Sequence, residues 1–295
     1  RSSSSNRFAT TDRNRHDCTT GTPRSAGTAH LPGLQRHHPH RPGRGRGDGP
    51  LPDPGVRQPS STHSYGAAAH AGLEKARRQV AELIAAPADS VVFTGSGSEA
   101  DALAIRGAVL AARPGGRRHV ITQVSEHPAV LAACRELEEL HGVDVTYLGV
   151  DHHGQVDPAE VAAALTPDTV LVSVMHANNE TGTIQPIARI ARTTKSADVL
   201  LHVDAAQSAG KIDIDVDALG VDLLTVVGHK MYAPKGIGAL YVRPGVRIRA
   251  LIGGAGQEHR LRAGTENVAY AVGFREAAPL AAPSPAAGPS QRPPD

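Results

Sequence analysis

The sequence is poor in the side chains that stack on flat ligands or join strands covalently. It has no tryptophan, and aromatic residues make up 3% of its 295 residues. This composition argues against a base-stacking or aromatic-cage binding protein. Its two cysteines, Cys18 and Cys134, show no pairing pattern, so we expect no disulfide framework and a reducing, cytoplasmic location.

Long apolar runs and a strong charge imbalance are also absent. No segment is apolar over the length that crosses a bilayer, and the amino end lacks the apolar core of a signal peptide. The formal net charge is +2 at pH 7. We therefore expect neither nucleic acid nor a membrane surface as the main partner.

Both ends of the sequence differ from its middle. Residues 1–58 contain arginine but no lysine, few large apolar side chains and no helical or strand period. We expect them to be disordered, since they have too little apolar surface to offset the entropy of ordering. Two origins fit: a basic RNA-like or targeting tail, or an altered reading frame or mispredicted start, which we favour. Residues 279–295, rich in proline and alanine, are also expected to be disordered.

The middle of the chain, residues 59–278, alternates apolar segments with amphipathic ones. Helical spacing is expected from residue 65 up to Pro87, with Val80 and Ile84 on one face. The further expected helices are 98–112, 127–141, 158–165 and 187–196, and the expected strands are 90–94, 119–123, 145–148, 170–175, 199–203, 223–227 and 237–242. This alternation predicts an α/β fold with a mainly parallel sheet covered by helices on both faces.

Polar residues follow several of these strands, where open α/β sheets bind their ligands. At TGSGSEAD, residues 94–101, a glycine-rich turn leads into a helix that Ser98 can cap. Free N–H groups at this helix start, with Gly97 and the Ser98 hydroxyl, form a candidate anion site. The turn also matches the G-x-G-x-x-A dinucleotide fingerprint, with Glu126 as the acid expected after the next strand. An NAD-dependent dehydrogenase is therefore a rival.

Three further strand ends carry a histidine, an asparagine and an aspartate. His127 suits two roles equally, stacking over a flat ring or capping the following helix. Asn179 suits a turn, and it can also donate a hydrogen bond to a ligand oxygen. Asp204 ends a buried strand, where a lone carboxylate is costly without a partner. A cationic ring nitrogen is a suitable one.

The last strand end carries Lys230, within GHKMYAPKG at residues 228–236. A desolvated lysine here can act as a Schiff-base nucleophile, although a solvated lysine in a loop between strands is the plainer interpretation. An anion site, a stacking histidine, a carboxylate and a lysine together match the needs of pyridoxal 5'-phosphate. A dehydrogenase needs none of Asp204, His229 and Lys230, so the joint pattern favours pyridoxal phosphate.

Several segments resemble the cysteine desulfurases, which are class V, fold-type I pyridoxal-phosphate enzymes. The most specific are HANNETG at residues 176–182 and GHKMYAPKG, and the matching segments run in order from Pro59 to Ala278. The resemblance implies that sulfur is removed from L-cysteine, leaving L-alanine and a persulfide for iron–sulfur clusters or other acceptors. It also implies a homodimer and a sulfur-acceptor or scaffold protein as partners.

The same resemblance implies a role for each candidate side chain. Lys230 would bind the cofactor covalently. The other implied contacts are His127 stacked on the ring, Asp204 on the ring nitrogen, Asn179 and Gln207 near the ring hydroxyl, Gly97, Ser98 and His229 at the phosphate, and Thr265 at the phosphate of the partner subunit.

The sequence also departs from the family pattern. Val227 stands where many relatives have a phosphate-binding serine, and Ala102 replaces a common asparagine. No cysteine follows Cys134, which lies among apolar residues in a predicted helix and is expected to be core. The small domain that carries the nucleophilic cysteine is expected to be missing, so we predict impaired desulfurase activity. Two alternatives are a class V aminotransferase or lyase that needs no such cysteine, and a catalytically dead binding or dimerisation fragment.

Overall fold

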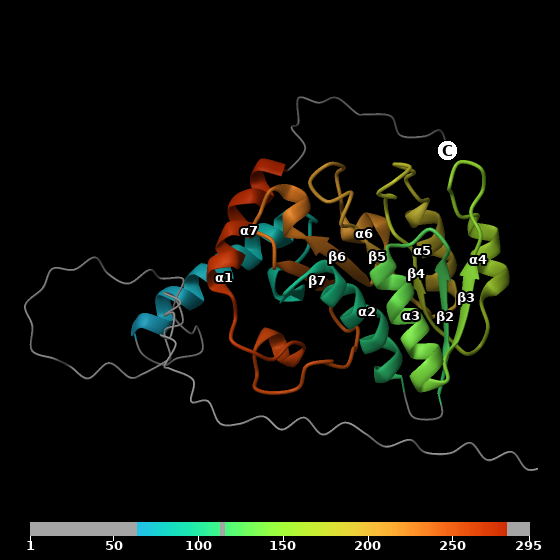
Figure 1. The fold of residues 1–295 in the computed structure, drawn as a ribbon, viewed down its shortest axis with the longest axis horizontal. Helices are drawn as coiled ribbons and strands as arrows, with labels where there is room; N and C mark the ends of the chain where they lie inside the picture. The colour runs from blue at the N-terminus through green and yellow to red at the C-terminus, as the bar shows by residue number, and fades with distance from the viewer. Residues whose placement is uncertain (1–63, 113–115, 282–295) are drawn as a thin grey trace, which may run out of the picture. The chain divides into compact units, whose positions relative to one another are not determined.

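Seven strands form one sheet at the centre of the molecule (Figure 1). The computed structural model describes residues 64–112 and 116–281. The strands are β1 (Val91–Thr94), β2 (His119–Gln123), β3 (Asp144–Leu148), β4 (Thr169–Ser173), β5 (Leu200–Asp204), β6 (Leu223–Val227) and β7 (Gly238–Val242), in the spatial order β1-β7-β6-β5-β4-β2-β3. Within these residues β7 alone runs opposite to the other six strands. The prediction of a mainly parallel sheet is confirmed.

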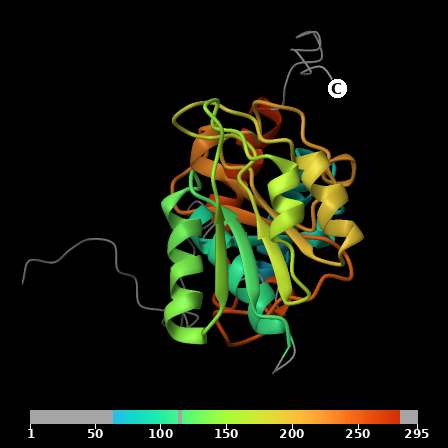
Figure 2. The same ribbon diagram turned by 90° about the vertical axis from the view of Figure 1, so that its right-hand side faces the viewer.

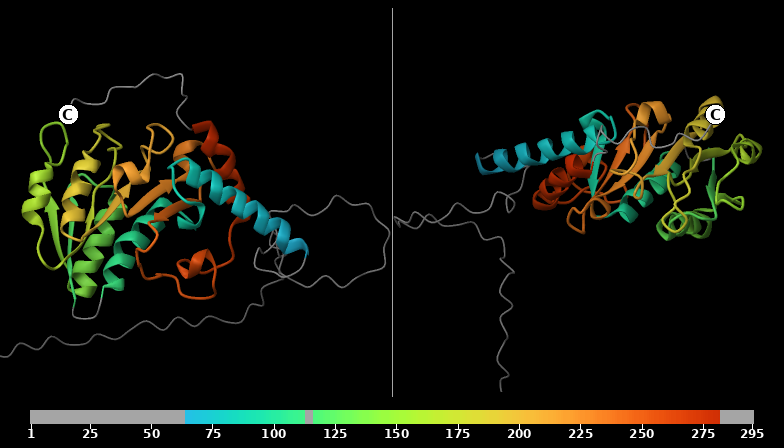
Figure 3. Two further views of the ribbon diagram at one scale, coloured as in Figure 1. Left: turned by 180° about the vertical axis from the view of Figure 1, so that it is seen from behind. Right: turned by 90° about the horizontal axis from the view of Figure 1, so that it is seen from above.

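Helices cover both faces of the sheet. They are α1 (Ser64–Glu82), α2 (Gly97–Ala111), α3 (Pro128–His141), α4 (Pro158–Ala164), α5 (Ile187–Ser196), α6 (Val216–Leu219) and α7 (Val268–Ala281). The α2 and α3 helices bury their apolar residues against one face, and the other five helices pack on the opposite face. Figure 2, seen from the β3 edge, shows α3 on one side and α4 and α5 on the other. Figure 3 shows α1 packed beside α7.

The interior strand β6 shows why the sheet is buried on both sides. All five of its residues are buried. Leu224 and Val226 belong to the core that α1, α5 and α7 cover, whereas Leu223 belongs to the core under α2 and α3. Successive side chains of a strand point to opposite faces, so a sheet covered twice needs a continuous apolar run. This pattern makes β6 a rigid base for the residues that follow it.

The structure differs from the predicted elements in a few places. Ser96, not Ser98, caps α2: its side chain accepts a hydrogen bond from Glu99 N at 3.1 Å. The α7 helix was not predicted and extends to Ala281, so residues 279–281 are helical rather than part of a disordered tail. The short α6 helix was not predicted either. The expectations of disorder for residues 1–58 and 282–295 lie outside the described residues. None of the described helices is long and apolar enough to span a membrane.

Candidate active site at the carboxyl edge of the sheet

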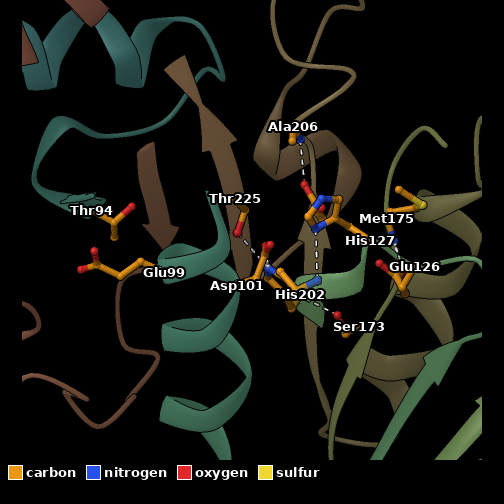
Figure 4. A network of polar contacts seen from close by, with 12 residues as sticks. Thr94, Glu99, Asp101, Glu126, His127, Ser173, Met175, His202, Ala206 and Thr225 are labelled. Atoms are coloured by element: carbon orange, nitrogen blue, oxygen red, sulfur yellow. Dashed lines mark hydrogen bonds and ion pairs between the residues drawn. The ribbon is translucent and has the colours of Figure 1, made fainter. Parts of the chain in front are cut away.

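The carboxyl ends of the parallel strands surround a cavity of about 190 Å³. Because these strands run in the same direction, the residues that follow them lie at one edge of the sheet. The cavity lining includes eight of the predicted site residues: Gly97, Ser98, His127, Asn179, Asp204, Gln207, His229 and Lys230. Residues spread over more than 130 positions of sequence therefore meet in one place. Figure 4 shows part of this region with its polar contacts.

One end of the cavity is formed by the start of α2. The glycine-rich turn after β1 leads directly into this helix, whose first N–H groups have no partner within the helix. Ser96 satisfies the N–H of Glu99, and the Glu99 carboxylate accepts from Gly95 N at 2.8 Å. Ser98 is exposed on the cavity wall. The helix dipole and the remaining N–H groups favour an anion here, such as a phosphate.

The same end of the cavity depends on a close contact between Gly97 and Val227. Val227 ends β6, and its side chain occupies the space that a Cβ at position 97 would need. A residue larger than glycine therefore cannot enter without moving Val227, whose branched side chain is stiff. Val227 also lines the cavity with an apolar surface, so it offers an anion no hydrogen bond.

His127 lies at the start of α3, on the exposed side of the cavity. Its Nδ1 accepts a hydrogen bond from Ala129 N at 3.2 Å, so it caps the helix. Capping fixes one ring nitrogen and leaves the faces of the imidazole free. The two roles that the sequence suggests, capping and stacking, are therefore compatible in this geometry.

Asp204 ends β5 and is 4% exposed. Its Oδ1 accepts a hydrogen bond from Ala206 N at 2.8 Å. Burial raises the pKa of Asp204, while this hydrogen bond and the charges of His127 and Lys230 act in the opposite direction. A buried carboxylate that lines a cavity is well placed to receive a cation from a ligand, because a cation would stabilise its charged form.

Lys230 lies on η3 (Gly228–Met231), a 3-10 turn that begins directly after β6. The turn needs Gly228, because a Cβ there would lie 2.8 Å from Ile237 Cγ2. Lys230 is exposed, which differs from the desolvated lysine that the sequence suggested. Partial desolvation and the charges of Lys230 and Lys235 lower the pKa of His229, so its ring is neutral at physiological pH.

Asn179 and Gln207 also line the cavity. Asn179 Nδ2 donates to Glu180 Oε1 at 2.6 Å, and Gln207 Oε1 accepts from Lys211 Nζ at 3.0 Å. Each amide therefore keeps one end available to the cavity. Their neighbour Asn178 is buried and holds the loop, since its Nδ2 donates to Ser125 O at 2.9 Å.

Thr265 is the one predicted site residue outside this cavity. It lines a second cavity of about 250 Å³, together with Gly95, Glu258 and Arg262. Arg262 Nε donates to Glu99 Oε1 at 2.8 Å. This bond links the segment around Thr265 to the first turn of α2, which follows the glycine-rich turn after β1. The predicted role of Thr265 toward a partner subunit stays a prediction.

Two residues from the competing interpretations are buried in structural roles. Cys134 is fully buried within the α2–α3 core, and burial raises the pKa of its thiol to about 12. It is neither accessible nor ionised, as expected of a core residue. Glu126, the acid of the dehydrogenase interpretation, is 6% exposed and accepts from Met175 N at 2.6 Å and from Gln123 Nε2 at 3.0 Å. Its burial, with Oε1 held by these two donors, keeps the carboxyl group in the interior and away from a ribose.

Asp101 is a cavity residue that the sequence reasoning missed. It lines the same cavity as Asp204 and is 2% exposed. The signal was present, because Asp101 lies on α2 in helical register with the apolar residues Ala104, Ile105 and Ala108. A charged residue on the buried face of a helix is rare without a partner, so such a position is a candidate site residue.

Comparison with known families shows to which protein family the chain belongs. The model for aminotransferase class-V matches residues 56–284. The chain belongs to the aminotransferase class V family. Cysteine desulfurase IscS of Dictyoglomus turgidum is 48% identical over 223 residues, which cover 76% of this chain and 56% of the relative. The cysteine desulfurase of a Nostoc species is 50% identical over 222 residues, covering 75% and 55%. This class V chain thus spans about half the length of these curated relatives.

Solved structures agree with this assignment to class V. SspA in complex with cysteine matches with a TM-score of 0.75 at 40% identity, covering 80% of this chain and 67% of SspA. A NifS-like protein matches with a TM-score of 0.74 at 38% identity, covering 77% and 62%. The resemblance to cysteine desulfurases and the fold-type I architecture are confirmed, and the dehydrogenase interpretation is set aside. Cysteine desulfurases and their class depend on pyridoxal phosphate, the cofactor expected from the sequence.

The residues in the cavity fit this cofactor. The start of α2 suits its phosphate, the buried Asp204 suits its ring nitrogen, and the exposed Lys230 amine suits its aldehyde. Val227 is the exception, since it presents methyl groups beside the phosphate position. The residues present therefore fit three distinct chemical groups of the cofactor, whereas Val227 offers a phosphate no hydrogen bond.

Proposed function

We propose that this chain binds pyridoxal phosphate through Lys230 and activates L-cysteine for removal of its sulfur. The observation that carries the proposal is the convergence of Asp204, Lys230 and the α2 helix start on one cavity. The chain's similarity to cysteine desulfurases, and to SspA in complex with cysteine, supports cysteine as the substrate. Because the chain spans about half of its curated relatives, the activity of the whole protein is part of this proposal.

The role proposed for each side chain is supported by its chemistry and by its place in the cavity lining. Pyridoxal phosphate, when bound, withdraws electrons from the substrate and stabilises negative charge on its reacting carbon. Asp204 would keep the ring nitrogen protonated, and His127 would cover the ring. Asn179 and Gln207 would hold the ring hydroxyl, while Gly97, Ser98 and His229 would hold the phosphate. The Lys230 amine would hold the cofactor and, as general base and acid, would move a proton from and to the substrate carbon.

The thiol that accepts the sulfur is not in the described part of the chain. A thiolate must attack the cysteine sulfur, the carbon–sulfur bond must break, and the carbon must gain a proton to leave alanine. Cys134 cannot serve, because it is buried with a raised pKa. We propose that desulfuration by this chain is impaired unless a thiol is supplied from outside residues 64–281, and that the physiological acceptor is another protein.

Turnover with L-cysteine tests this function. Purified chain loaded with pyridoxal phosphate should release alanine slowly, and an added small thiol should increase that rate. Lys230→Ala should abolish the increase. Lys235→Ala removes another exposed lysine, eight positions after the end of β6, and should keep it. Rapid alanine release without added thiol, sensitive to Lys230→Ala, would contradict the impairment. If no alanine is released under any condition, the result would support the alternative that the chain is a catalytically dead binding fragment.

The buried state of Cys134 favours one second candidate, a class V aminotransferase or lyase that needs no cysteine nucleophile. The products separate the two, because a lyase acting on L-cysteine releases pyruvate and ammonia with the sulfide. Alanine as the carbon product supports desulfuration. Pyruvate as the main carbon product supports the lyase.

A homodimer is also part of the proposal. Thr265 is exposed beside the phosphate turn but lies outside the cofactor cavity, so it would serve the phosphate of a second copy. Analytical ultracentrifugation should show a dimer, and Thr265→Ala should weaken cofactor binding without changing the fold of the monomer. A monomer with full cofactor affinity would contradict this arrangement.

We also propose a cytoplasmic location, as expected from the use of cysteine in the sequence.

A further inference from the structure

Asp101 is a buried acid in the cofactor cavity to which the function described above assigns no task. It lies in the second turn of α2, and its side chain projects toward His202 and Thr225 (Figure 4). Only 2% of the residue is exposed, yet it lines the same cavity as Asp204 and Lys230. A carboxylate in such a place needs a compensating charge or a proton.

No cation compensates Asp101 among the described residues. The nearest basic group is His202, whose Nε2 lies 3.7 Å from Asp101 Oδ1. The two ring nitrogens of His202 face the hydroxyls of Ser173 at 2.9 Å and Thr225 at 3.1 Å. Burial lowers the pKa of His202 to about 3, so the ring is neutral at physiological pH. Asp101 Oδ1 itself has no hydrogen-bond partner in the described part of the chain.

Three carboxyl groups share this low-dielectric region: Asp101 on α2, Glu126 after β2 and Asp204 on β5. Burial, together with the charges of Asp204 and Glu126, holds the pKa of Asp101 well above its usual range. Burial and Asp204 raise the pKa of Glu126 to about 8. Like charges in a shared buried site cannot all ionise, so protons must remain on some members of the set.

The surroundings decide which member carries the charge. Asp204 has the N–H of Ala206 and the nearby positive charges of His127 and Lys230. Asp101 has only the hydroxyl of Thr225 and a neutral imidazole. The negative charge is therefore better stabilised on Asp204 than on Asp101.

We propose that Asp101 is a positioning residue that keeps its proton, so that the single negative charge of the Asp101–Asp204 pair resides on Asp204, opposite the cofactor's ring nitrogen. Asp101 then acts through Asp204 and does not touch the cofactor. The inference rests on the proposed function for its benefit to the cofactor, but the protonation of Asp101 is a property of the chain alone. The two parts can be tested separately.

Infrared spectroscopy of the cofactor-free chain tests the protonation. A protonated carboxyl group has a C=O stretching band apart from the carboxylate bands, and we expect two such buried groups at neutral pH, Asp101 and Glu126. Carbon-13 labelling of aspartate should shift one band in the wild-type chain, which needs no variant to fold. Asp101→Asn should remove that band, and Glu126→Gln should remove the other. If no carboxyl band shifts on aspartate labelling, or if Asp101→Asn leaves the shifted band in place, the proposal is overturned.

Cofactor affinity tests the division of roles between the two acids. Asn resembles a protonated aspartate in charge and shape, so Asp101→Asn should change the dissociation constant of pyridoxal phosphate by less than about 3-fold. Asp204→Asn removes the charge and should weaken binding by about 10-fold or more, since it removes a charge-assisted hydrogen bond to the ring nitrogen. An equal loss in both variants would overturn the proposal. No binding by the wild-type chain, with the infrared bands as expected, would refute the proposed function and leave the protonation of Asp101 standing.

Discussion

The Arg77 guanidinium forms two parallel hydrogen bonds with the Glu258 carboxylate, 2.7 Å and 2.9 Å long, across 181 positions of sequence. Both side chains are buried. Arg77 also donates to Val91 O at 2.6 Å, and Glu258 accepts from Phe93 N at 2.7 Å. The pair thereby fixes η4 (Glu258–Arg260) against α1 and β1. It also positions the segment that leads from η4 to Thr265.

Removing one member of this pair should destabilise the chain strongly. Glu258→Ala leaves Arg77 charged and buried, and it leaves the Phe93 N–H without its acceptor. We expect the free energy of unfolding to fall by about 3–5 kcal/mol. The matched control is Glu276→Ala, which breaks an exposed ion pair with Arg275 and should cost less than about 1 kcal/mol. Urea denaturation measures both, and equal small losses would show that the buried pair is not a structural anchor.

Glu126 should make stability depend on pH. Its folded pKa of about 8 lies above that of an exposed glutamate. A raised acid pKa means that the folded chain holds a proton that the unfolded chain has lost. The stabilisation is therefore complete below the unfolded pKa, and it is lost as pH rises through the folded value.

In measurable terms, the unfolding free energy of the wild-type chain should fall by a few kcal/mol relative to Glu126→Gln between pH values of about 4.5 and 8, since each pKa unit corresponds to about 1.4 kcal/mol. Glutamine keeps the acceptor for Met175 N and Gln123 Nε2 and cannot titrate. Parallel pH profiles for the two proteins would contradict the raised pKa.

The two serines at the start of α2 should separate stability from cofactor binding. Ser96 caps the helix through Glu99 N, so Ser96→Ala should cost about 1 kcal/mol of unfolding free energy. Ser98 is exposed on the cavity wall and makes no cap, so Ser98→Ala should leave stability within about 0.5 kcal/mol. If Ser98 binds the phosphate, its substitution should instead weaken pyridoxal phosphate binding, measured by absorbance titration. The opposite pattern would restore Ser98 as the cap.

The contact between Gly97 and Val227 should appear in a double-mutant cycle. Gly97→Ala places a methyl group where the Val227 side chain lies, and overpacking of this kind costs about 1–3 kcal/mol. In a Val227→Ala background the space is open, so the same substitution should cost less than about 1 kcal/mol. Thermal unfolding of the four proteins measures the coupling. Additive effects would mean that the two residues do not restrict each other.

Much of the fold follows from local sequence pattern. The apolar run of β6 and the helical spacing of α5 predict elements with the observed bounds, because packing on both faces of a sheet demands that pattern. The α7 helix was missed although Val268, Ala271 and Phe274 have helical spacing, since the proline-rich sequence after residue 278 masked it. Its Pro279 lies in the last turn, where the helix is about to end.

The site was predictable as a set of strand ends, but its electrostatics were not. His127, Asp204 and Lys230 follow strands, so their meeting depends only on the strands being parallel. The proton balance of Asp101 depends on Glu126 and His202, whose approach comes from tertiary packing. The exposure of Lys230 likewise depends on the turn after Gly228, which pattern alone does not specify. Local spacing predicts position, whereas burial and charge require the folded chain.

The covalent attachment of the cofactor tests the central claim most directly. The chain is mixed with pyridoxal phosphate, the Schiff base is reduced with borohydride, and the peptides are analysed by mass spectrometry. The account predicts a pyridoxyl group on Lys230, in near-stoichiometric amount, and its loss in Lys230→Ala but not in Lys235→Ala. Modification spread over Lys211, Lys230 and Lys235 alike, or absent from Lys230, would contradict it.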